Sequence, residues 1–320
     1  MRVFLVLAIC CLGLRPELSA QRDTTFIQLF DNIGRVNTGL RYRDRGVAFR
    51  APTGEELKLN SQTLAFRIGG RYRFASYTFS IPILDLEDNG DGQRSGGFGL
   101  GLTLFMREQL LSGRFKTTRG FRTTTSDGTT VFRDDTDLFA ATLYGFRVLN
   151  HRNYSLRAAF KQRDRQLKSA GSFLIGGLVD RQVLTSTDGI ETPLEDGNFQ
   201  LLTRLAQTKI GIGVGYAHTF LMGDHFFVTP FAIAGPEFRF IRNDAVIEGT
   251  EQDNVRVSPR LRSYLAVGHN GKKTAVALTV SNLPAYDDGE NLDIKRTNFT
   301  VELRITRRLG FGRQPQRARR

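Results

Sequence analysis

Apolar side chains recur at every second position along most of the chain after residue 35, and this period constrains the fold more than any other feature. In residues 63–74, Leu64, Phe66 and Ile68 share one face, whereas Ala65 and Arg67 share the other. Successive side chains of a β-strand point to opposite sides of its sheet, so this period predicts strands. The same alternation is found in residues 98–107, 208–216 and 299–306, among other segments. We therefore expect an all-β fold.

Two β folds fit such strands: a soluble sandwich or barrel with its apolar face inside, and a membrane barrel with its apolar face toward lipid. Three features favour the membrane barrel. The predicted strands run about nine to eleven residues, which is enough to cross a bilayer when tilted. Their polar faces are rich in Gly, Thr, Ser and Arg, which suit a wet lumen. Short and longer links also alternate, as periplasmic turns and outer loops do in bacterial barrels. The short links lie near 73–76, 108–110, 149–153, 222–225 and 269–273, and the longer ones near 50–61, 84–97, 122–137, 184–207, 242–254 and 282–297.

This order of links predicts a transmembrane antiparallel up-and-down β-barrel of about twelve strands over residues 36–311, provided that 154–183 is one extended element. Splitting that element gives thirteen strands, an odd number that single-chain bacterial barrels avoid. A further strand at 199–206 would raise the count to fourteen, which is the alternative prediction. Aromatic residues beside the short links predict an interfacial girdle. These are Tyr72, Phe74, Tyr77, Tyr144, Phe146, Tyr154, Phe220, Phe226 and Phe227.

The first twenty residues have a positively charged start, an apolar block at 3–14 and a small residue, Ala20, at their end. This pattern predicts a secretory signal peptide over residues 1–20 that is cleaved after Ala20. Both cysteines, Cys10 and Cys11, lie within it. The mature chain then has no thiol, and its stability has to come from backbone pairing and packing.

Two short segments flank the predicted barrel. Residues 21–35 hold Phe26, Leu29, Phe30 and Ile33 at helical spacing, so we expect a short N-terminal periplasmic or plug segment there. Residues 312–320 are rich in Arg, and we expect a solvated basic tail.

Three stretches of the chain are also familiar in detail: Leu40-Arg41-Tyr42-Arg43, residues 163–173, and residues 262–270. With them the chain resembles an uncharacterised family of Gram-negative outer-membrane β-barrels, catalogued as a domain of unknown function. The resemblance spans most of the mature chain, and residues 163–173 are its most distinctive part. It implies a barrel in the outer membrane of a Gram-negative bacterium and implies no activity. Outer-membrane lipid, lipopolysaccharide and the barrel assembly machinery are then the expected partners.

Basic residues are in excess: 45 Lys and Arg stand against 32 Asp and Glu, for a formal net charge of +13. Many of them fall on the strand face opposite the apolar set, and rings of Arg and Lys in a lumen favour anions. The prediction is therefore a passive, anion-preferring channel for small solutes. The alternative is a structural or accessory envelope barrel, in which these arginines pair with acids and the lumen is plugged. The predicted lumen residues are Arg67, Arg71, Arg107, Arg147, Arg157, Lys161, Arg256, Arg260, Arg262 and Arg304.

Nucleic acid is not an expected partner, because the basic residues follow the strand alternation and lack an aromatic stacking face. An outer-membrane hydrolase is the third reading, with His151, His218, His225 and His269 as candidate bases. None of these is followed two residues later by Ser, and the Asn-Gly after His269 is a hairpin signal. The acidic run at 85–92 lacks the Glu that closes a calcium loop. We therefore expect this protein to have no enzymatic activity, no cofactor and no metal site.

Overall fold

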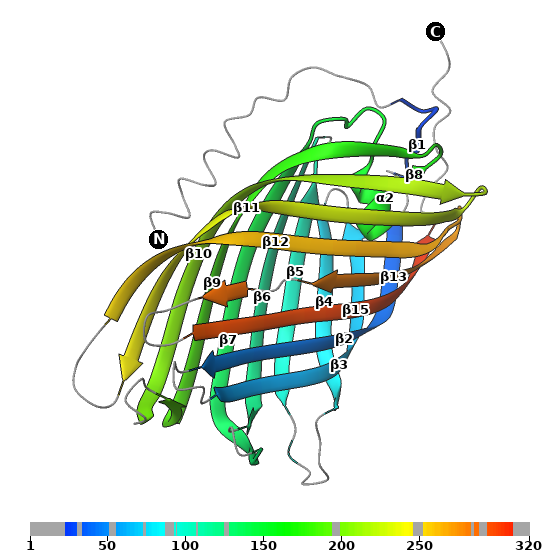
Figure 1. Cartoon of the computed structure of the whole chain (residues 1–320). Coiled ribbons are helices and arrows are strands. Elements are labelled where there is room, and N and C mark those ends of the chain that lie inside the picture. Colours follow the sequence, from blue (N-terminus) through cyan, green and yellow to red (C-terminus); the bar gives the residue numbers. More distant parts are fainter. Residues whose placement is uncertain are drawn as a thin grey trace.

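The computed structural model describes residues 23–30, 34–50, 56–72, 75–86, 93, 95–106, 108–124, 128–193, 199–245, 252–282, 285–287 and 293–309. Within them, twelve strands form one closed antiparallel barrel, which confirms the predicted architecture and strand count (Figure 1). Each strand pairs with its neighbour in the chain, and the last pairs with the first. The strands are β2 (Gly34–Arg50), β3 (Glu56–Tyr72), β4 (Ala75–Asp85), β5 (Gly96–Phe105), β6 (Gln109–Thr124), β7 (Thr130–Val148), β9 (Ala170–Pro193), β10 (Phe199–Met222), β11 (Phe226–Ala245), β12 (Gln252–Asn270), β13 (Thr274–Asn282) and β15 (Asp293–Leu309). The predicted signal peptide and basic tail lie outside the described residues.

The outer face of the barrel is apolar and its inner face is largely polar. On β10, Ile212 and Val214 are 63% and 66% exposed, whereas Ala217 and Thr219 on the inner face are buried. On β3, Phe66 and Ile68 face out, whereas Arg67, which lies between them in the sequence, faces in and is buried. Exposed apolar faces around a closed barrel are the arrangement that lipid requires, because the strands then leave no unpaired edge and present no charge to hydrocarbon.

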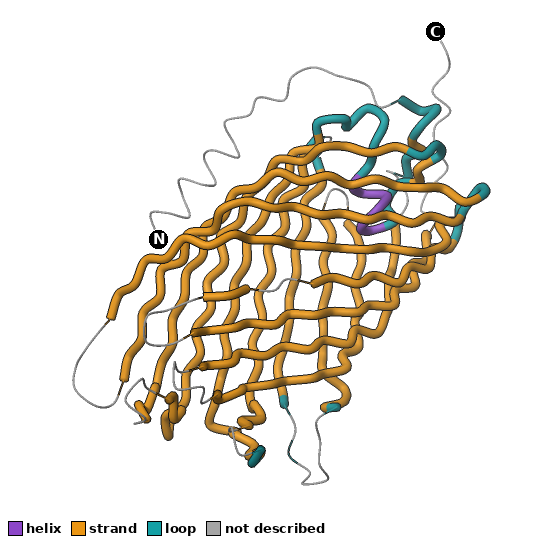
Figure 2. Tube along the Cα trace, in the orientation of Figure 1, coloured by secondary structure: helices purple, strands orange, loops and turns teal. Residues whose placement is uncertain are grey.

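The connection between β7 and β9 folds into the barrel at the end where β2 begins and β15 ends, here called the turn end (Figures 1 and 2). It contains helix α2 (Leu156–Lys161) and strand β8 (Arg165–Gln166), which pairs with β1 (Ile27–Gln28). The prediction that 154–162 is part of a strand is therefore wrong. Ser155 caps the helix by accepting a hydrogen bond from the backbone N–H of Ala158, and the Leu-Arg-Ala-Ala-Phe-Lys run consists mostly of good helix formers.

The N-terminal segment lies beside this connection. Residues 24–26 form a turn and Ile27 begins β1, so the predicted helical spacing around Phe26 and Phe30 is not realised; Ile33 lies outside the described residues. Ile27 and Phe30 are nevertheless buried. Among the described residues, no helix is long and apolar enough to cross a membrane.

Because α2 fills the turn end, the barrel interior there is an ordinary hydrophobic core. Tyr144, Phe146 and Val148 of β7 point inward and pack with Tyr154 and Leu156. The predicted aromatic girdle is therefore wrong for Tyr144, Phe146, Tyr154 and Phe227, all of which are buried. Tyr77, Phe220 and Phe226 are exposed, as a girdle requires, and the side chains of Tyr72 and Phe74 lie outside the described part of the structure.

At the opposite end, here called the loop end, the barrel narrows. The pairing of β4 with β5 stops at Ser80 and Gly99, and β3 then pairs directly with β6 at residues 58–60. Strands β2 and β3 also contact β9 across the interior. A buried apolar cluster fills this end, and we call it the loop-end cluster. It comprises Phe49, Leu57, Leu59, Phe121, Leu184, Ile190, Leu202, Leu205 and Ile241.

The predicted long links at 50–61, 122–137 and 184–207 are wrong in extent. Strands continue into them, so that β3 begins at Glu56, β7 at Thr130, and β9 and β10 each run for 24 residues. Here the strands are held together by the inward packing of the loop-end cluster. Their sequences therefore do not need the apolar–polar alternation that contact with lipid imposes. A three-residue strand, β14 (Ala285–Asp287), extends the same end against β15.

Candidate functional site

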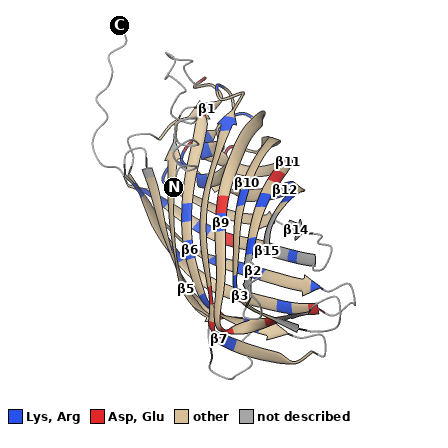
Figure 3. Ribbon diagram, turned by 90° about the vertical axis from the view of Figure 1, so that its left-hand side faces the viewer, with Lys and Arg blue, Asp and Glu red and all other residues tan. Residues whose placement is uncertain are grey.

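Six of the ten predicted lumen residues point into the barrel: Arg67, Arg71, Arg256, Arg260, Arg262 and Arg304. Their sequence neighbours face out; Val255, Val257 and Leu261 on β12, for example, are 63%, 62% and 53% exposed. Basic residues recur along the strands, whereas acidic residues are sparse (Figure 3).

One carboxylate, that of Glu302 on β15, gathers three of the lumen cations. It accepts hydrogen bonds from Arg41 of β2 at 2.7 Å and from Arg304 at 2.6 Å, and it forms an ion pair with Arg67 of β3. All four side chains are at most 16% exposed. Because three strands contribute to it, this cluster holds one acid and three cations at fixed positions on one side of the lumen.

Two further acids hold part of the remaining charge. Glu237 on β11 bonds Arg239 at 2.8 Å and lies 3.7 Å from Arg260. Asp180 on β9 accepts hydrogen bonds from Thr142 and Gln182. Tyr144 lies between two cations, since the Arg114 and Arg262 guanidinium carbons are each 5.0 Å from its ring centroid.

The carboxyl end of α2 is held by guanidinium groups of the barrel wall. Arg35 donates to the carbonyl oxygen of Lys161 at 2.7 Å, Arg304 to that of Phe160 at 2.9 Å, and Arg308 to that of Gln162 at 2.6 Å. The last carbonyl groups of a helix lack intrahelical partners and carry partial negative charge, so cations are favourable there. Three arginines of the barrel wall thus hold α2 in place through its last carbonyl groups.

Arg157 and Lys161 lie on α2, not on a strand, so their predicted place on a strand face is wrong. Arg157 donates to Asp164 at 2.8 Å, and Asp164 also accepts from the Ser155 hydroxyl at 2.7 Å. Lys161 is enclosed by the barrel, and burial, followed by the charge of Arg304, holds its pKa well below the usual range of a lysine.

Arg147 is placed wrongly by the prediction, because it lies on the outer face near the turn end. It is bonded to Glu108 at 3.2 Å and its side chain is 52% exposed. The reason is that its neighbours Phe146 and Val148 point inward onto α2, which reverses the polarity assumed for this part of β7. Arg107 lies outside the described residues.

Further lumen cations were not predicted, although they obey the same alternation. On β2, Arg41, Arg43 and Arg45 occupy successive inward positions, opposite to the exposed Leu40. The signal that could have revealed them is the Arg at every second residue from 41 to 45. The unpredicted set is Arg35, Arg41, Arg43, Arg45, Arg114, Lys116, Lys209, Arg239 and Arg308.

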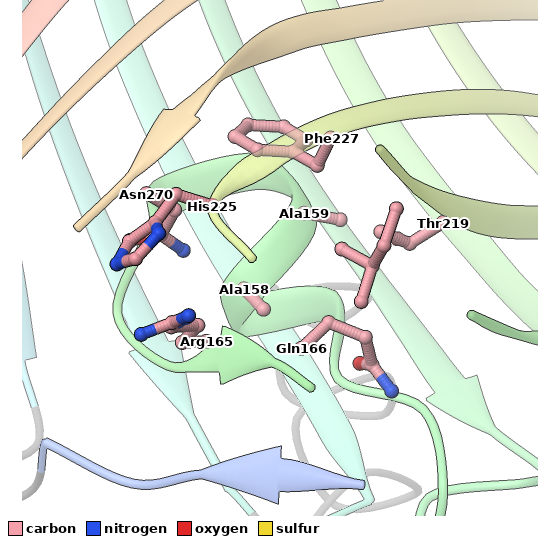
Figure 4. A pocket seen from close by; sticks show the side chains of 9 residues that line it. Ala158, Ala159, Arg165, Gln166, Thr219, His225, Phe227 and Asn270 are labelled. Carbon is pink, nitrogen blue, oxygen red and sulfur yellow. The ribbon is translucent and has the colours of Figure 1, made fainter. Parts of the chain in front are cut away.

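A small pocket lies between α2 and the wall, with room for about one water molecule (Figure 4). Ala158 and Ala159 of α2 face Thr219 of β10 and Phe227 of β11 across it. Its size excludes a substrate, so it is a packing gap beneath the helix.

The four histidines lie near the turn end or on the outside. His225 and His269 stack with ring centroids 5.2 Å apart, His218 lies 3.1 Å from the Tyr216 hydroxyl, and His151 lies 3.4 Å from Glu108. Within the described part of the chain, no three His, Cys, Asp or Glu residues are placed to hold a metal ion.

A family model described as Domain of unknown function (DUF4421) matches residues 21–308. No curated protein gives a significant match. Solved structures that are similar at low identity include three outer-membrane proteins. The translocator domain of the autotransporter NalP from Neisseria meningitidis is 14% identical, with a TM-score of 0.47, over 97% of this chain and 95% of that one. The outer-membrane protease OmpT from Escherichia coli is 8% identical, with a TM-score of 0.43, over 88% and 98%. An outer-membrane channel from Pseudomonas putida F1 is 10% identical, with a TM-score of 0.38, over 91% and 100%.

Proposed function

Since the chain belongs to the family described as Domain of unknown function (DUF4421), which lends it no activity, we propose its function from the lumen itself. The protein is an outer-membrane barrel that admits small anionic solutes through a positively charged lumen, with the segment 149–169 restricting passage at the turn end.

The membrane location rests on the outer face. Large apolar side chains stay exposed on strand after strand, including Ile81, Phe173, Ile175, Val214 and Leu261, each more than 50% exposed. An apolar surface that surrounds a soluble protein would drive aggregation, whereas in a bilayer it is the favourable solvent contact. A closed antiparallel barrel with an even number of strands is typical of bacterial outer membranes.

The single observation that carries the anion preference is the charge of the inner face. On the barrel wall, six predicted and nine unpredicted cations point inward or hold α2, whereas the inward acids described above for the wall are Glu302, Glu237 and Asp180. Rings of Arg and Lys select anions because they lower the electrostatic cost of bringing an anion into a narrow polar channel.

Conductance across a planar bilayer with a potassium chloride gradient tests this proposal. The purified full chain and a variant with a loosened helix, Arg35→Gln with Arg308→Gln, are compared. We expect a small conductance for the first and a larger one for the second, both with a reversal potential of anion-selective sign. Arg147→Gln, on the outer face, is the matched control and should behave as the unchanged chain.

A structural envelope barrel is the second candidate, and a specific observation favours it: α2 fills the turn end while the loop-end cluster fills the other. If neither protein conducts although both show heat-modifiable migration, this candidate is supported. Cation selectivity in either protein would refute the anion channel.

A further inference from the structure

Three inward cations, Arg43 and Arg45 of β2 and Lys116 of β6, are not neutralised by the strands beside them. We call them the cationic triad. Arg43 is opposite Thr63 and Thr300, and Arg45 is opposite Ser61 and Asn298. Lys116 is opposite Gly99 and Ala140. Every cross-strand neighbour of the triad is thus uncharged.

The charges that do reach the triad are mostly positive. Arg43 interacts with Arg41, Arg45, Arg67 and Arg114, and Lys116 interacts with Arg41 and the rest of the triad. Like charges that face one another in a partly desolvated site raise the free energy of the barrel unless an anion joins them.

The acids of this region are already engaged. Glu302 is bonded to Arg41 and Arg304 and paired with Arg67. Asp180 reaches Arg45 electrostatically, yet its two oxygens accept hydrogen bonds from Thr142 and Gln182.

The triad also has unused hydrogen-bond donors. Within the described part of the chain, the buried Nε atom of Arg45 has no hydrogen-bond partner. No hydrogen bond or ion pair of the Arg43 or Lys116 side chain is found among the described residues. Several donors in one region are therefore available to a ligand.

The wall beside the triad is made of small side chains. The inner faces of β4 and β5 carry Ser80, Gly99 and Gly101, and a methyl group added at Gly99 or Gly101 would meet atoms no closer than 3.5 Å. Arg114, which also faces the lumen here, is exposed to solvent. Water and small solutes thus have access to the triad from the lumen.

We propose that Arg43, Arg45 and Lys116 bind one water-soluble oxyanion that carries two or more negative charges. A guanidinium group donates paired hydrogen bonds to two oxygens of one carboxylate or phosphate group, and Lys adds a point charge. A monovalent anion would leave most of the triad unneutralised. This inference deepens the proposed function, on which it rests for solute access to the lumen, by naming a binding step within it.

Isothermal titration calorimetry of the full chain in detergent tests the site, with sodium pyrophosphate as the probe. Ionic strength is held constant with sodium chloride, and sodium acetate serves as a monovalent oxyanion. We expect one pyrophosphate per chain and no detectable acetate binding. Arg45→Gln with Lys116→Gln should weaken pyrophosphate binding at least tenfold, and the single variant Lys116→Gln should weaken it severalfold.

The matched control is Arg147→Gln, which removes a cation from the outer face and should leave the affinity within twofold. Heat-modifiable migration establishes that each variant is folded, and the single Lys116→Gln variant provides the test if the double variant is not. Equal pyrophosphate binding by the triad variants and the unchanged chain would overturn the proposal, and so would acetate binding of equal strength.

The two proposals can fail separately. Pyrophosphate binding that depends on the triad, in a barrel that carries no current, supports the site and refutes the channel. An anion-selective current without pyrophosphate binding refutes the site and leaves the channel.

Discussion

The Arg35 guanidinium donates a hydrogen bond of 2.7 Å to the carbonyl oxygen of Lys161, the last residue of α2. Arg35 also donates to the Ser76 hydroxyl at 3.0 Å, so it ties the helix to β2 and β4 together. A lumen arginine that would attract a solute anion in an empty barrel here binds the partial negative charge of a helix end. The positive charge of the lumen therefore has two uses, and only part of it faces solute.

Replacing Arg35 with Met should loosen α2 while leaving the barrel closed. The change removes a charged donor from the helix end, and such hydrogen bonds contribute about 1.5 to 3 kcal/mol. Hydrogen exchange of the amides of α2 should accelerate about tenfold or more, because each 1.4 kcal/mol is a factor of ten. Unchanged protection of α2 would contradict this anchoring role. Arg147→Met, on the outside, should not affect it.

Phe160→Ala should also loosen α2, because it removes apolar contacts between the helix and the barrel wall. The Phe160 ring lies 5.3 Å from that of Phe231 and 4.4 Å from that of Tyr264, centroid to centroid. Phe160 is partly buried, so truncating it should cost up to about 3 kcal/mol, the low end of the range for a core Phe. Limited proteolysis of the detergent-solubilised protein should then cut between residues 149 and 169. If cleavage occurs equally in the unchanged chain, the helix is not held by this contact.

Glu302→Gln should destabilise the barrel more than any single change at an exposed acid. It leaves Arg41, Arg67 and Arg304 buried without their shared carboxylate, and breaking a buried pair costs about 3 to 5 kcal/mol. The urea concentration at the midpoint of unfolding in detergent should fall accordingly.

Glu108→Gln is the control for that change. Glu108 pairs with Arg147 at 3.2 Å on the outer face, where both side chains are at least 35% exposed, and such pairs contribute about 0 to 1 kcal/mol. Equal shifts in the two variants would show that the network around Glu302 contributes no special stability.

The barrel could be predicted from the sequence because lipid and water impose one period on both faces of a strand. Ile212 and Val214 face out and Thr219 faces in without regard to any distant residue. The same rule locates Arg67 and Arg304 in the lumen. It would equally have located Arg43 and Arg45, since they share the phase of Arg41 on β2.

The turn end could not be predicted, because its period is set by a partner distant in the sequence. Phe146 points inward since α2 offers it an apolar surface, and this turns Arg147 outward. Alternation in 154–162 could not distinguish a strand from a six-residue helix whose stability comes from Arg35, Arg304 and Arg308 on distant strands. The loop-end cluster escaped prediction for the same reason, because Phe49 and Leu184 meet only in the folded barrel.

The last prediction concerns the loop-end cluster. Phe49 is fully buried and Leu59 is 1% exposed, although both lie on the lumen face of strands that elsewhere carry polar inward side chains. Leu59→Ser should remove apolar packing at a cost of about 2 to 5 kcal/mol and admit water between β3 and β9. If this cluster closes the loop end, conductance should rise when Leu59→Ser is combined with Arg35→Gln and Arg308→Gln, beyond the level of the arginine changes alone. Leu303→Ser, on the lipid-facing side of β15, should leave conductance unchanged and reduce stability only. Equal currents with and without Leu59→Ser would show that the loop end does not limit ion passage, and that the restriction lies at α2.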